Sequence, residues 1–141
     1  MKILIGYDGS EESKKALDIV KQYAKILSAE AYVLTVVEGG PHAVREVYQK
    51  AEEDLTFAKN SIAAAGVRCT AKLSAQGLEP GEDLLQFAEE NATDLIITGI
   101  QKRSKMGKLL FGSNAQYVIL NAACPVLTVN KAGLAVHSHI R

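Results

Sequence analysis

The sequence has few of the residues that mark redox, metal-binding or nucleic-acid-binding proteins. Its 141 residues include two cysteines and three histidines, and its 16 basic residues balance its 16 acidic ones. Cys69 and Cys124 stand far apart and form neither a CxxC motif nor a metal-ligand spacing, which favours reduced thiols of a cytosolic protein. The balanced charge gives no global field that would attract a nucleic acid or a membrane surface.

Long hydrophobic runs are also missing. The N-terminal stretch MKILIGYDGS has one lysine and an apolar run that is too short for a signal peptide or a membrane span. We therefore expect a cytoplasmic protein without a membrane partner. The composition, 48% hydrophobic and 23% charged, is that of a globular protein, and the length fits one domain.

Several familiar site motifs are absent. The P-loop pattern fails because Leu109 follows Gly107-Lys108 and because Lys102 stands where the leading glycine belongs. No GxGxxG follows the first apolar run. Two of the three histidines lie near the C-terminus, so the sequence offers few residues for a Ser-His-Asp triad or for a metal site.

Short apolar runs alternate with longer segments of helical periodicity along the chain. We expect strands at 2–6, 31–37, 67–73, 94–98 and 125–129, with a helix between each pair. Ser10 suits the start of the first helix, and Gly66 suits the end of the second. This β-α-β-α-β-α-β-α-β order predicts a three-layer α/β domain with a parallel sheet, followed by a loosely held tail.

Two polar, glycine-containing segments follow predicted strands. They are GYDGS at 6–10 and the basic stretch 99–114. In open parallel sheets, ligands bind beyond the carboxyl ends of strands, where the strand order reverses. If the order is 3-2-1-4-5, the first and fourth strands are neighbours there, and both segments face one crevice.

The chemistry of these segments suits an anionic ligand. Gly112-Ser113-Asn114 opens a helix, where free N–H groups and the helix dipole attract phosphate. Gly112 permits close phosphate approach, and Gly99 permits a sharp turn out of the sheet. Asp8 can accept hydrogen bonds from ribose hydroxyls or help to hold Mg²⁺. Structural explanations remain open: a strand exit and a helix cap for the glycines, and a turn residue for Asp8.

Three stretches together resemble the universal stress protein family. They are KILIGYDGSEESKKAL at the start, GIQKRSKMGKLLFGS late in the chain and CPVLTVN at the last strand. The resemblance covers residues 1–131, which we take as one nucleotide-binding domain, with 132–141 as a C-terminal tail. It implies a Rossmann-like, HUP-type fold with a five-stranded parallel sheet in the order 3-2-1-4-5. It also implies a homodimer paired through the last strands, here Pro125–Val129, and further protein partners.

The resemblance also implies ATP as a ligand, because many members of that family bind it through the pattern G-x2-G-x9-G-[ST]. Gly99 fits the first position, and Gly112 with Ser113 fits the end, whereas Lys102 replaces the second glycine. Its β-carbon either crowds the phosphates, or its ammonium adds charge to the triphosphate site. By position, Asp8 lies near the ribose and Mg²⁺, and the Val36 backbone meets the adenine.

The expected function is an ATP-binding stress-response module with slow or no hydrolysis, rather than an enzyme. The alternative is a nucleotide-free member that acts through protein partners. An ATP pyrophosphatase is the weakest candidate, because GYDGSEES replaces the expected SGGxDS loop. The candidate site residues are Gly6, Asp8, Val36, Thr98, Gly99, Gln101, Lys102, Gly112, Ser113 and Asn114.

Overall fold

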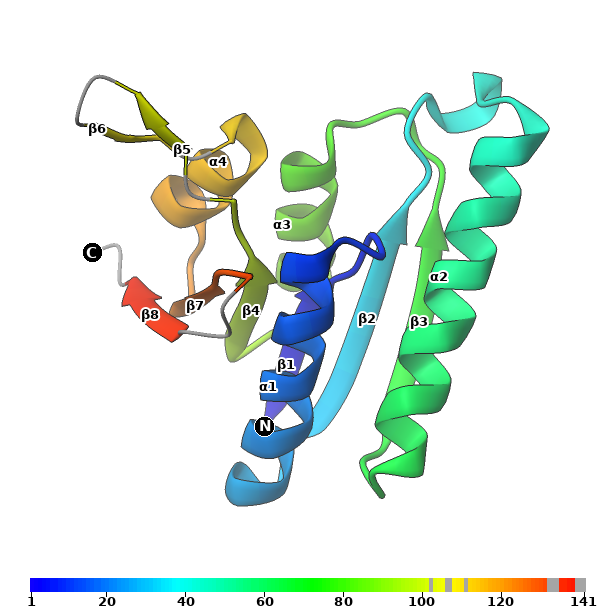
Figure 1. Cartoon of the computed structure of the whole chain (residues 1–141). Coiled ribbons are helices and arrows are strands. Elements are labelled where there is room, and N and C mark those ends of the chain that lie inside the picture. Colours follow the sequence, from blue (N-terminus) through cyan, green and yellow to red (C-terminus); the bar gives the residue numbers. More distant parts are fainter. Residues whose placement is uncertain (102, 106–107, 111, 132–134, 139–141) are drawn as a thin grey trace.

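A twisted sheet forms the middle layer of the molecule in the computed structural model (Figure 1). The structure describes residues 1–101, 103–105, 108–110, 112–131 and 135–138, with the backbone alone for 103–105, 108–110 and 135–138. The strands of this sheet are β1 (Lys2–Gly6), β2 (Glu30–Val36), β3 (Cys69–Ser74), β4 (Leu95–Gly99), β7 (Val126–Val129) and β8 (Ala135–Ser138). A separate hairpin consists of β5 (Arg103–Lys105) and β6 (Lys108–Leu110).

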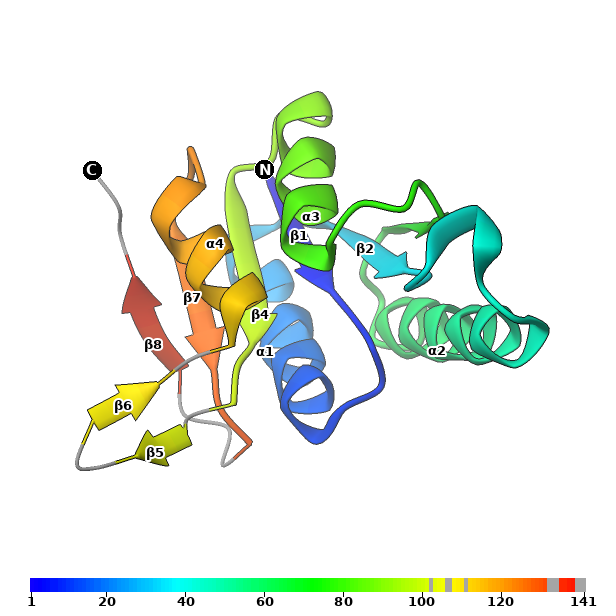
Figure 2. The ribbon, with the colours of Figure 1, turned by 90° about the horizontal axis from the view of Figure 1, so that it is seen from above.

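Helices cover both faces of the sheet. They are α1 (Glu11–Leu27), α2 (Arg45–Ala64), α3 (Pro80–Glu90) and α4 (Ser113–Asn121), with a short 3₁₀ turn at Gly40–His42. The first two pack on one face, and α3 and α4 pack on the other (Figure 2). The expected three-layer α/β architecture is confirmed.

The strand order is β3-β2-β1-β4-β7, and all four of these pairings are parallel. This confirms the predicted order 3-2-1-4-5. In the register, Ile5 on β1 lies opposite Val33 on β2 and Ile97 on β4. The first and fourth parallel strands are therefore neighbours, and the strand order reverses between them.

The chain after β7 differs from the loosely held tail that we expected. Strand β8 pairs antiparallel with β7, and Thr128 lies opposite Val136. An uncovered edge strand offers a row of unpaired backbone groups, which a following extended segment can pair with. The sequence signal for β8 is weak because the strand spans only four residues.

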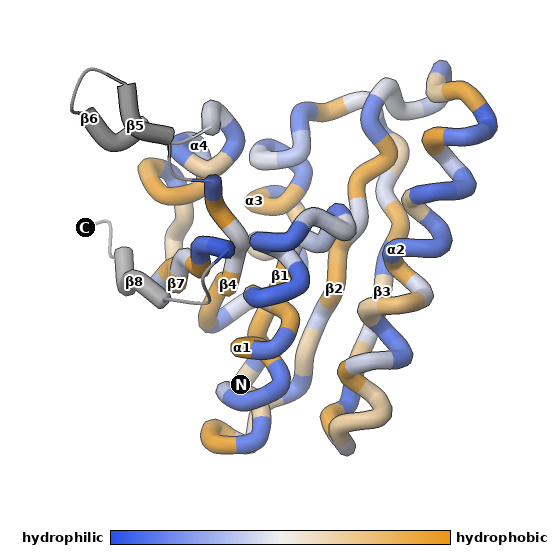
Figure 3. The backbone as a smooth tube through the Cα atoms, viewed as in Figure 1, coloured by the Kyte–Doolittle hydropathy of each residue, from blue (hydrophilic) through white to orange (hydrophobic). Residues whose placement is uncertain are grey.

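Alternating strand residues divide the hydrophobic core into two layers. Ile3 and Ile5 belong to the cluster under α1 and α2, whereas Leu4 belongs to the cluster under α3 and α4. All three are fully buried. Figure 3 shows hydrophobic colour along much of β2 and β4 and interrupted hydrophobic colour along α2. Burial on both faces explains why the central strands are continuous apolar runs.

Ser10 and Gly66, from which the start of the first helix and the end of the second were predicted, occupy the expected positions. Ser10 caps α1, because its Oγ accepts a hydrogen bond from the Ser13 N–H at 3.2 Å. Gly66 follows α2 with a φ of +81°, a left-handed conformation that glycine adopts without a steric penalty. Local sequence signals therefore place the first two helices.

Gly99, at the end of β4, packs directly against the backbone at the start of α1. A β-carbon at this position would lie 2.5 Å from the carbonyl carbon of Glu12 and 2.7 Å from the Ser13 nitrogen. Gly99→Ala should therefore push α1 away from the sheet and lower the free energy of unfolding by about 1–3 kcal/mol. Urea denaturation monitored by circular dichroism measures this loss.

Gly112→Ala is the matched control. The N-cap Gly112 has φ −61° and ψ 156°, which any residue adopts, and a β-carbon there would have no neighbour within 4 Å. The control should change the free energy of unfolding by less than about 1 kcal/mol. Equal stability of the two variants would contradict the packing role of Gly99.

Candidate functional site

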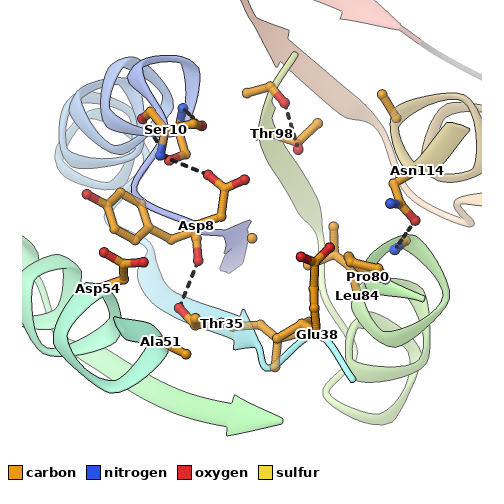
Figure 4. A pocket seen from close by; sticks show the side chains of 18 of the residues that line it. Asp8, Ser10, Thr35, Glu38, Ala51, Asp54, Pro80, Leu84, Thr98 and Asn114 are labelled. Carbon is orange, nitrogen blue, oxygen red and sulfur yellow. Dashed lines mark hydrogen bonds between the residues drawn. The ribbon is translucent and has the colours of Figure 1, made fainter. Parts of the chain in front are cut away.

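A cleft of about 470 Å³ opens beyond the carboxyl ends of β1, β2 and β4 (Figure 4). Its floor comes from the strand ends: Gly6 through Asp8, Leu34 through Val36, and Thr98 with Gly99. The chain leaves β1 for α1 on one face and leaves β4 for α4 on the other. This divergence opens the space between the two crossovers, as expected at a reversal of strand order.

Three helices direct their N-termini toward this cleft. Its lining includes Ser10 at the start of α1, Pro80 and Gly81 at the start of α3, and Asn114 and Ala115 at the start of α4. The first N–H groups of a helix have no partner within the helix, and the helix dipole adds partial positive charge there. The helix dipoles therefore give the cleft a potential that attracts anions, although Gly81 N–H already donates to Asn114 Oδ1 and Ser13 N–H to Ser10 Oγ.

The first turns of α3 and α4 are tied together at the cleft wall. The Gly81 N–H donates a hydrogen bond to Asn114 Oδ1 at 2.9 Å (Figure 4). A β-carbon at Gly81 would lie 3.0 Å from the Asn114 carbonyl oxygen. The side-chain oxygen of Asn114 therefore fixes the relative position of two helix N-termini.

A buried carboxylate anchors α3 from below. Asp83 is 2% exposed and accepts hydrogen bonds from Ser74 Oγ at 2.6 Å and from Gln76 Nε2 at 2.9 Å. Both of its oxygens are thereby satisfied, as a buried polar group requires. The contact fastens the end of β3 to the helix whose first turn lines the cleft.

Asp8 lies in the loop between β1 and α1, at the middle of the cleft. Its Oδ1 accepts a hydrogen bond from the Ser10 N–H at 3.0 Å. Burial would by itself raise the pKa of Asp8, but hydrogen bonds from Ser10 and Ser13 and the charge of Lys50 lower this pKa below its usual value. Asp8 is therefore an ionised acceptor at neutral pH.

The end of β2 offers backbone groups to the cleft. The Tyr7 N–H donates to the Leu34 carbonyl at 2.9 Å, and the Tyr7 carbonyl accepts from Thr35 Oγ1 at 2.9 Å. Backbone groups alternate in direction along a strand, so Val36 turns its N–H and C=O to the same side as Leu34. At Val36, strand β1 has already ended. These two groups therefore face the cleft.

Tyr7 forms the inner part of the wall toward α2. It is 3% exposed and stacks on Phe57, with ring centroids 6.2 Å apart. Burial, with the negative charges of Asp54, Asp8 and Glu11, raises the pKa of Tyr7 to about 12. The phenol therefore stays neutral at physiological pH, and its ring packs against α2.

The charged side chains of the described lining are mostly acidic. Asp8, Glu38 and Asp54 face the cleft with one basic residue, Lys50. Among the described residues, no group of three or more His, Cys, Asp or Glu side chains is arranged to hold a metal ion by itself. The attraction for anions therefore comes from the helix N-termini, whereas these carboxylates suit hydroxyl donors or a cation that a ligand brings.

The structure brings six predicted site residues to the cleft and leaves others outside it. The six are Gly6, Asp8, Val36, Thr98, Gly99 and Asn114. Gln101, Gly112 and Ser113 are not among the lining residues, although Gly112 and Ser113 directly precede Asn114 at the start of α4. Lys102, the departure from the glycine pattern, lies outside the described residues.

Gly99 and Gly112, the two glycines of the predicted motif, differ in whether packing within the protein requires a glycine there. Gly99 is needed for contact with the backbone of α1, which is a different reason from the sharp turn that we expected. Gly112 stands in ordinary extended backbone beside open space. Packing therefore explains the first glycine, and nothing in the described chain requires the second.

Sequence reasoning missed the contributions of α2 and α3. Lys50 and Asp54 on α2, and Leu84 on α3, line the cleft, as does Glu38 after β2. Pro80 directly after Glu79 is a usable signal for a helix N-terminus, because proline is favoured at the first helical position. The charged residues of α2 resemble those of any solvated helix face, and only the tertiary placement of α2 distinguishes them.

No helix in the described part of the chain combines the length and the hydrophobicity that a membrane crossing needs.

The depressed pKa of Asp8 predicts a pH-dependent contribution to stability. A folded-state pKa below the unfolded value means that the unfolded chain binds the proton more readily, so stability falls as the pH drops below about 3.8. Asp8→Asn should melt at a lower temperature than the wild type at pH 7, and this difference should shrink at pH 3. Thermal melts at both pH values measure it, and an unchanged difference would contradict the assignment.

Proteins similar to this chain share most of its length. A universal stress protein of Methanocaldococcus jannaschii is 34% identical over an alignment 143 residues long, which covers 92% of this chain and 82% of that protein. One from Thermus aquaticus is 32% identical over 133 residues, covering 90% and 96%. The solved structure of the universal stress protein from Archaeoglobus fulgidus in complex with dAMP has 28% identity and a TM-score of 0.76, covering 91% and 96%.

The sequence profile of the Universal stress protein family matches residues 1–130. This range contains every strand of the parallel sheet and all the described residues that line the cleft. The chain belongs to the universal stress protein family.

Proposed function

We propose that the protein binds ATP in the cleft beyond β1, β2 and β4 and acts as a nucleotide-dependent module in the stress response. The observation that carries this proposal is the convergence of the N-termini of α1, α3 and α4 on a cleft that contains the ionised Asp8. Helix N-termini attract phosphate, and a carboxylate accepts hydrogen bonds from ribose hydroxyls. The dAMP complex of the Archaeoglobus fulgidus protein supports an adenine nucleotide.

The adenine would occupy the end of the cleft near β2. There the Val36 carbonyl would accept a hydrogen bond from the exocyclic amine of adenine, and the Val36 N–H would donate to a ring nitrogen. Guanine presents a carbonyl oxygen and a ring N–H at the equivalent positions, so both hydrogen bonds would oppose it. Leu84 and Val118 supply apolar surface for the ring.

The ribose and phosphates would follow toward α1 and α4. Asp8 would accept from a ribose hydroxyl, and Thr98 and Asn114 would lie beside the sugar and the first phosphate. The outer phosphates would reach the start of α4 at Gly112 and Ser113. The open space at Gly112 fits this placement, because a phosphate can approach the helix N–H groups there.

Magnesium would arrive with the triphosphate. Mg²⁺ in nucleotide sites is usually held by one or two carboxylates together with the phosphates and water. Asp8 is the carboxylate in position to contribute, and the acidic lining at Glu38 and Asp54 would disfavour a bare triphosphate. We assign no catalytic residue, and we expect hydrolysis to be slow or absent.

Calorimetry with ATP and Mg²⁺ tests the proposal. The wild type should bind at micromolar to millimolar ATP, and Gly112→Val should weaken binding by at least about tenfold, because the side chain fills the phosphate approach. The residue has ordinary backbone angles and open surroundings, so the variant should fold. Normal binding by folded Gly112→Val would move the phosphates elsewhere.

The same experiment separates the two expected functions. Heat that saturates with ATP supports the nucleotide-dependent module. No heat at millimolar ATP, together with no nucleotide in mass spectra of gently purified protein, would favour the nucleotide-free member that acts through protein partners.

We further propose a homodimer that forms along the outer edge of β7, the strand within Pro125–Val129. In the chain by itself, β8 occupies that edge. Pairing of two β7 strands therefore requires β8 to leave β7. Val126 and Val129 are fully buried, so charged substitutions there would disrupt the core rather than report on the dimer.

Removal of β8 should favour this dimer. A chain truncated after Lys131 should sediment with a larger dimer fraction than the full chain at equal concentration. Val136→Pro is the second variant, because proline weakens the β8 pairing without shortening the chain. Unchanged sedimentation of both variants would place the interface elsewhere.

A further inference from the structure

Lys50 of helix α2 forms hydrogen bonds on both sides of the contact between α2 and the β1–α1 loop. Lys50 Nζ donates a hydrogen bond to Asp54 Oδ2 at 2.6 Å and another to the backbone carbonyl of Asp8 at 3.1 Å. All three residues line the cleft. A single ammonium group therefore bridges α2 and the backbone of the residue that carries the central carboxylate of the site.

The stability of α2 does not explain this arrangement. Lys50 stands four residues before Asp54, which is the less favourable order for an i,i+4 ion pair in a helix. The lysine side chain is also 67% exposed, where an ion pair contributes at most about 1 kcal/mol. The distinctive feature is the third partner, the Asp8 carbonyl, which lies on another element.

Asp54 makes its own close contact with the same loop. Gly9 has a φ of +79°, and a β-carbon there would lie 2.7 Å from Asp54 Oδ1 and 3.0 Å from its Cγ. The left-handed backbone conformation therefore favours glycine at this position, and a side chain there would displace the Asp54 carboxylate. Lys50 therefore bonds to Asp8, and Asp54 lies beside Gly9, so that α2 borders two consecutive residues of the loop.

The Asp8 side chain is oriented from the opposite side. Its Oδ1 accepts from the Ser10 N–H at the start of α1, whereas its carbonyl accepts from Lys50 on α2. Figure 4 shows the Asp8 carboxylate beside Ser10, with the dashed hydrogen bond between them. Hydrogen bonds weaken steeply with poor geometry, and a binding group must be held within about 0.5 Å to recognise its ligand.

We propose that Lys50 and Asp54 are positioning residues that fix the Asp8 carboxylate for recognition of the ribose hydroxyls of a nucleotide. This inference rests on the proposed nucleotide binding. It extends that function to α2, the helix that follows β2 in the chain. In this arrangement, Lys50 acts through Asp8 and gives the site its preference for a hydroxylated sugar.

The test compares two ligands, ATP and 2′,3′-dideoxy-ATP, by calorimetry with Mg²⁺. The dideoxy analogue lacks both hydroxyl groups that Asp8 can accept from, so the wild type should prefer ATP by about tenfold. Lys50→Met keeps the aliphatic stem and removes the donor. It should weaken ATP binding about fivefold and leave the analogue nearly unchanged, so that the preference falls to about twofold.

Three further variants sharpen the comparison. Lys50→Arg retains a cationic donor and should keep most of the preference for ATP. Asp54→Asn weakens the hold on Lys50 and should lower the preference in the same direction, by about twofold. Lys59→Met removes an exposed lysine elsewhere on α2 and should bind both ligands as the wild type does.

The outcomes separate this inference from the proposed function. A smaller preference in Lys50→Met, with an unchanged melting temperature, supports positioning. Equal weakening of both ligands, or no change, would overturn it and leave the nucleotide site intact. A wild type that binds both ligands equally would also overturn it, because Asp8 would not recognise the sugar. A wild type that binds neither ligand would overturn the proposed function and the inference together.

Discussion

The parallel pairing of β1 with β4 is the contact on which the rest of the site depends. It places the two points where the chain leaves the sheet toward opposite faces next to each other, with α1 on one side and α4 on the other. The crossovers therefore diverge and leave the strand ends uncovered. Gly99 strengthens this arrangement, because its missing side chain lets β4 contact the backbone of α1 directly.

The positive potential of the cleft comes from the backbone, and its negative charge comes from side chains. Helix N-termini supply the positive potential, whereas the described side chains of the lining are mainly acidic. A nucleotide is suited to such a division, because its phosphates are anionic and its sugar offers hydroxyl donors. The carboxylate of Asp8 keeps its charge despite burial because hydrogen bonds from Ser10 and Ser13 outweigh the cost of desolvation.

The sequence predicted the parts of the fold that local patterns encode. Apolar runs located the central strands, Ser10 and Gly66 marked helix ends, and polar segments after two strands pointed to the cleft. The position of α2 could not be predicted, because nothing local says which turn of a long helix faces a loop forty residues earlier. Lys50 and Asp54 were missed for this reason. Four-residue β8 was missed because its pairing depends on the edge that β7 presents.

Strand β8 also changes what the edge of the sheet offers to other molecules. It pairs antiparallel with β7 and so takes up backbone N–H and C=O groups along the outer edge of that strand. A row of unpaired groups at a sheet edge is a template on which a strand of another chain can add, and this is a route to aggregation. By covering β7 from within the same chain, β8 protects this edge against such uncontrolled strand addition.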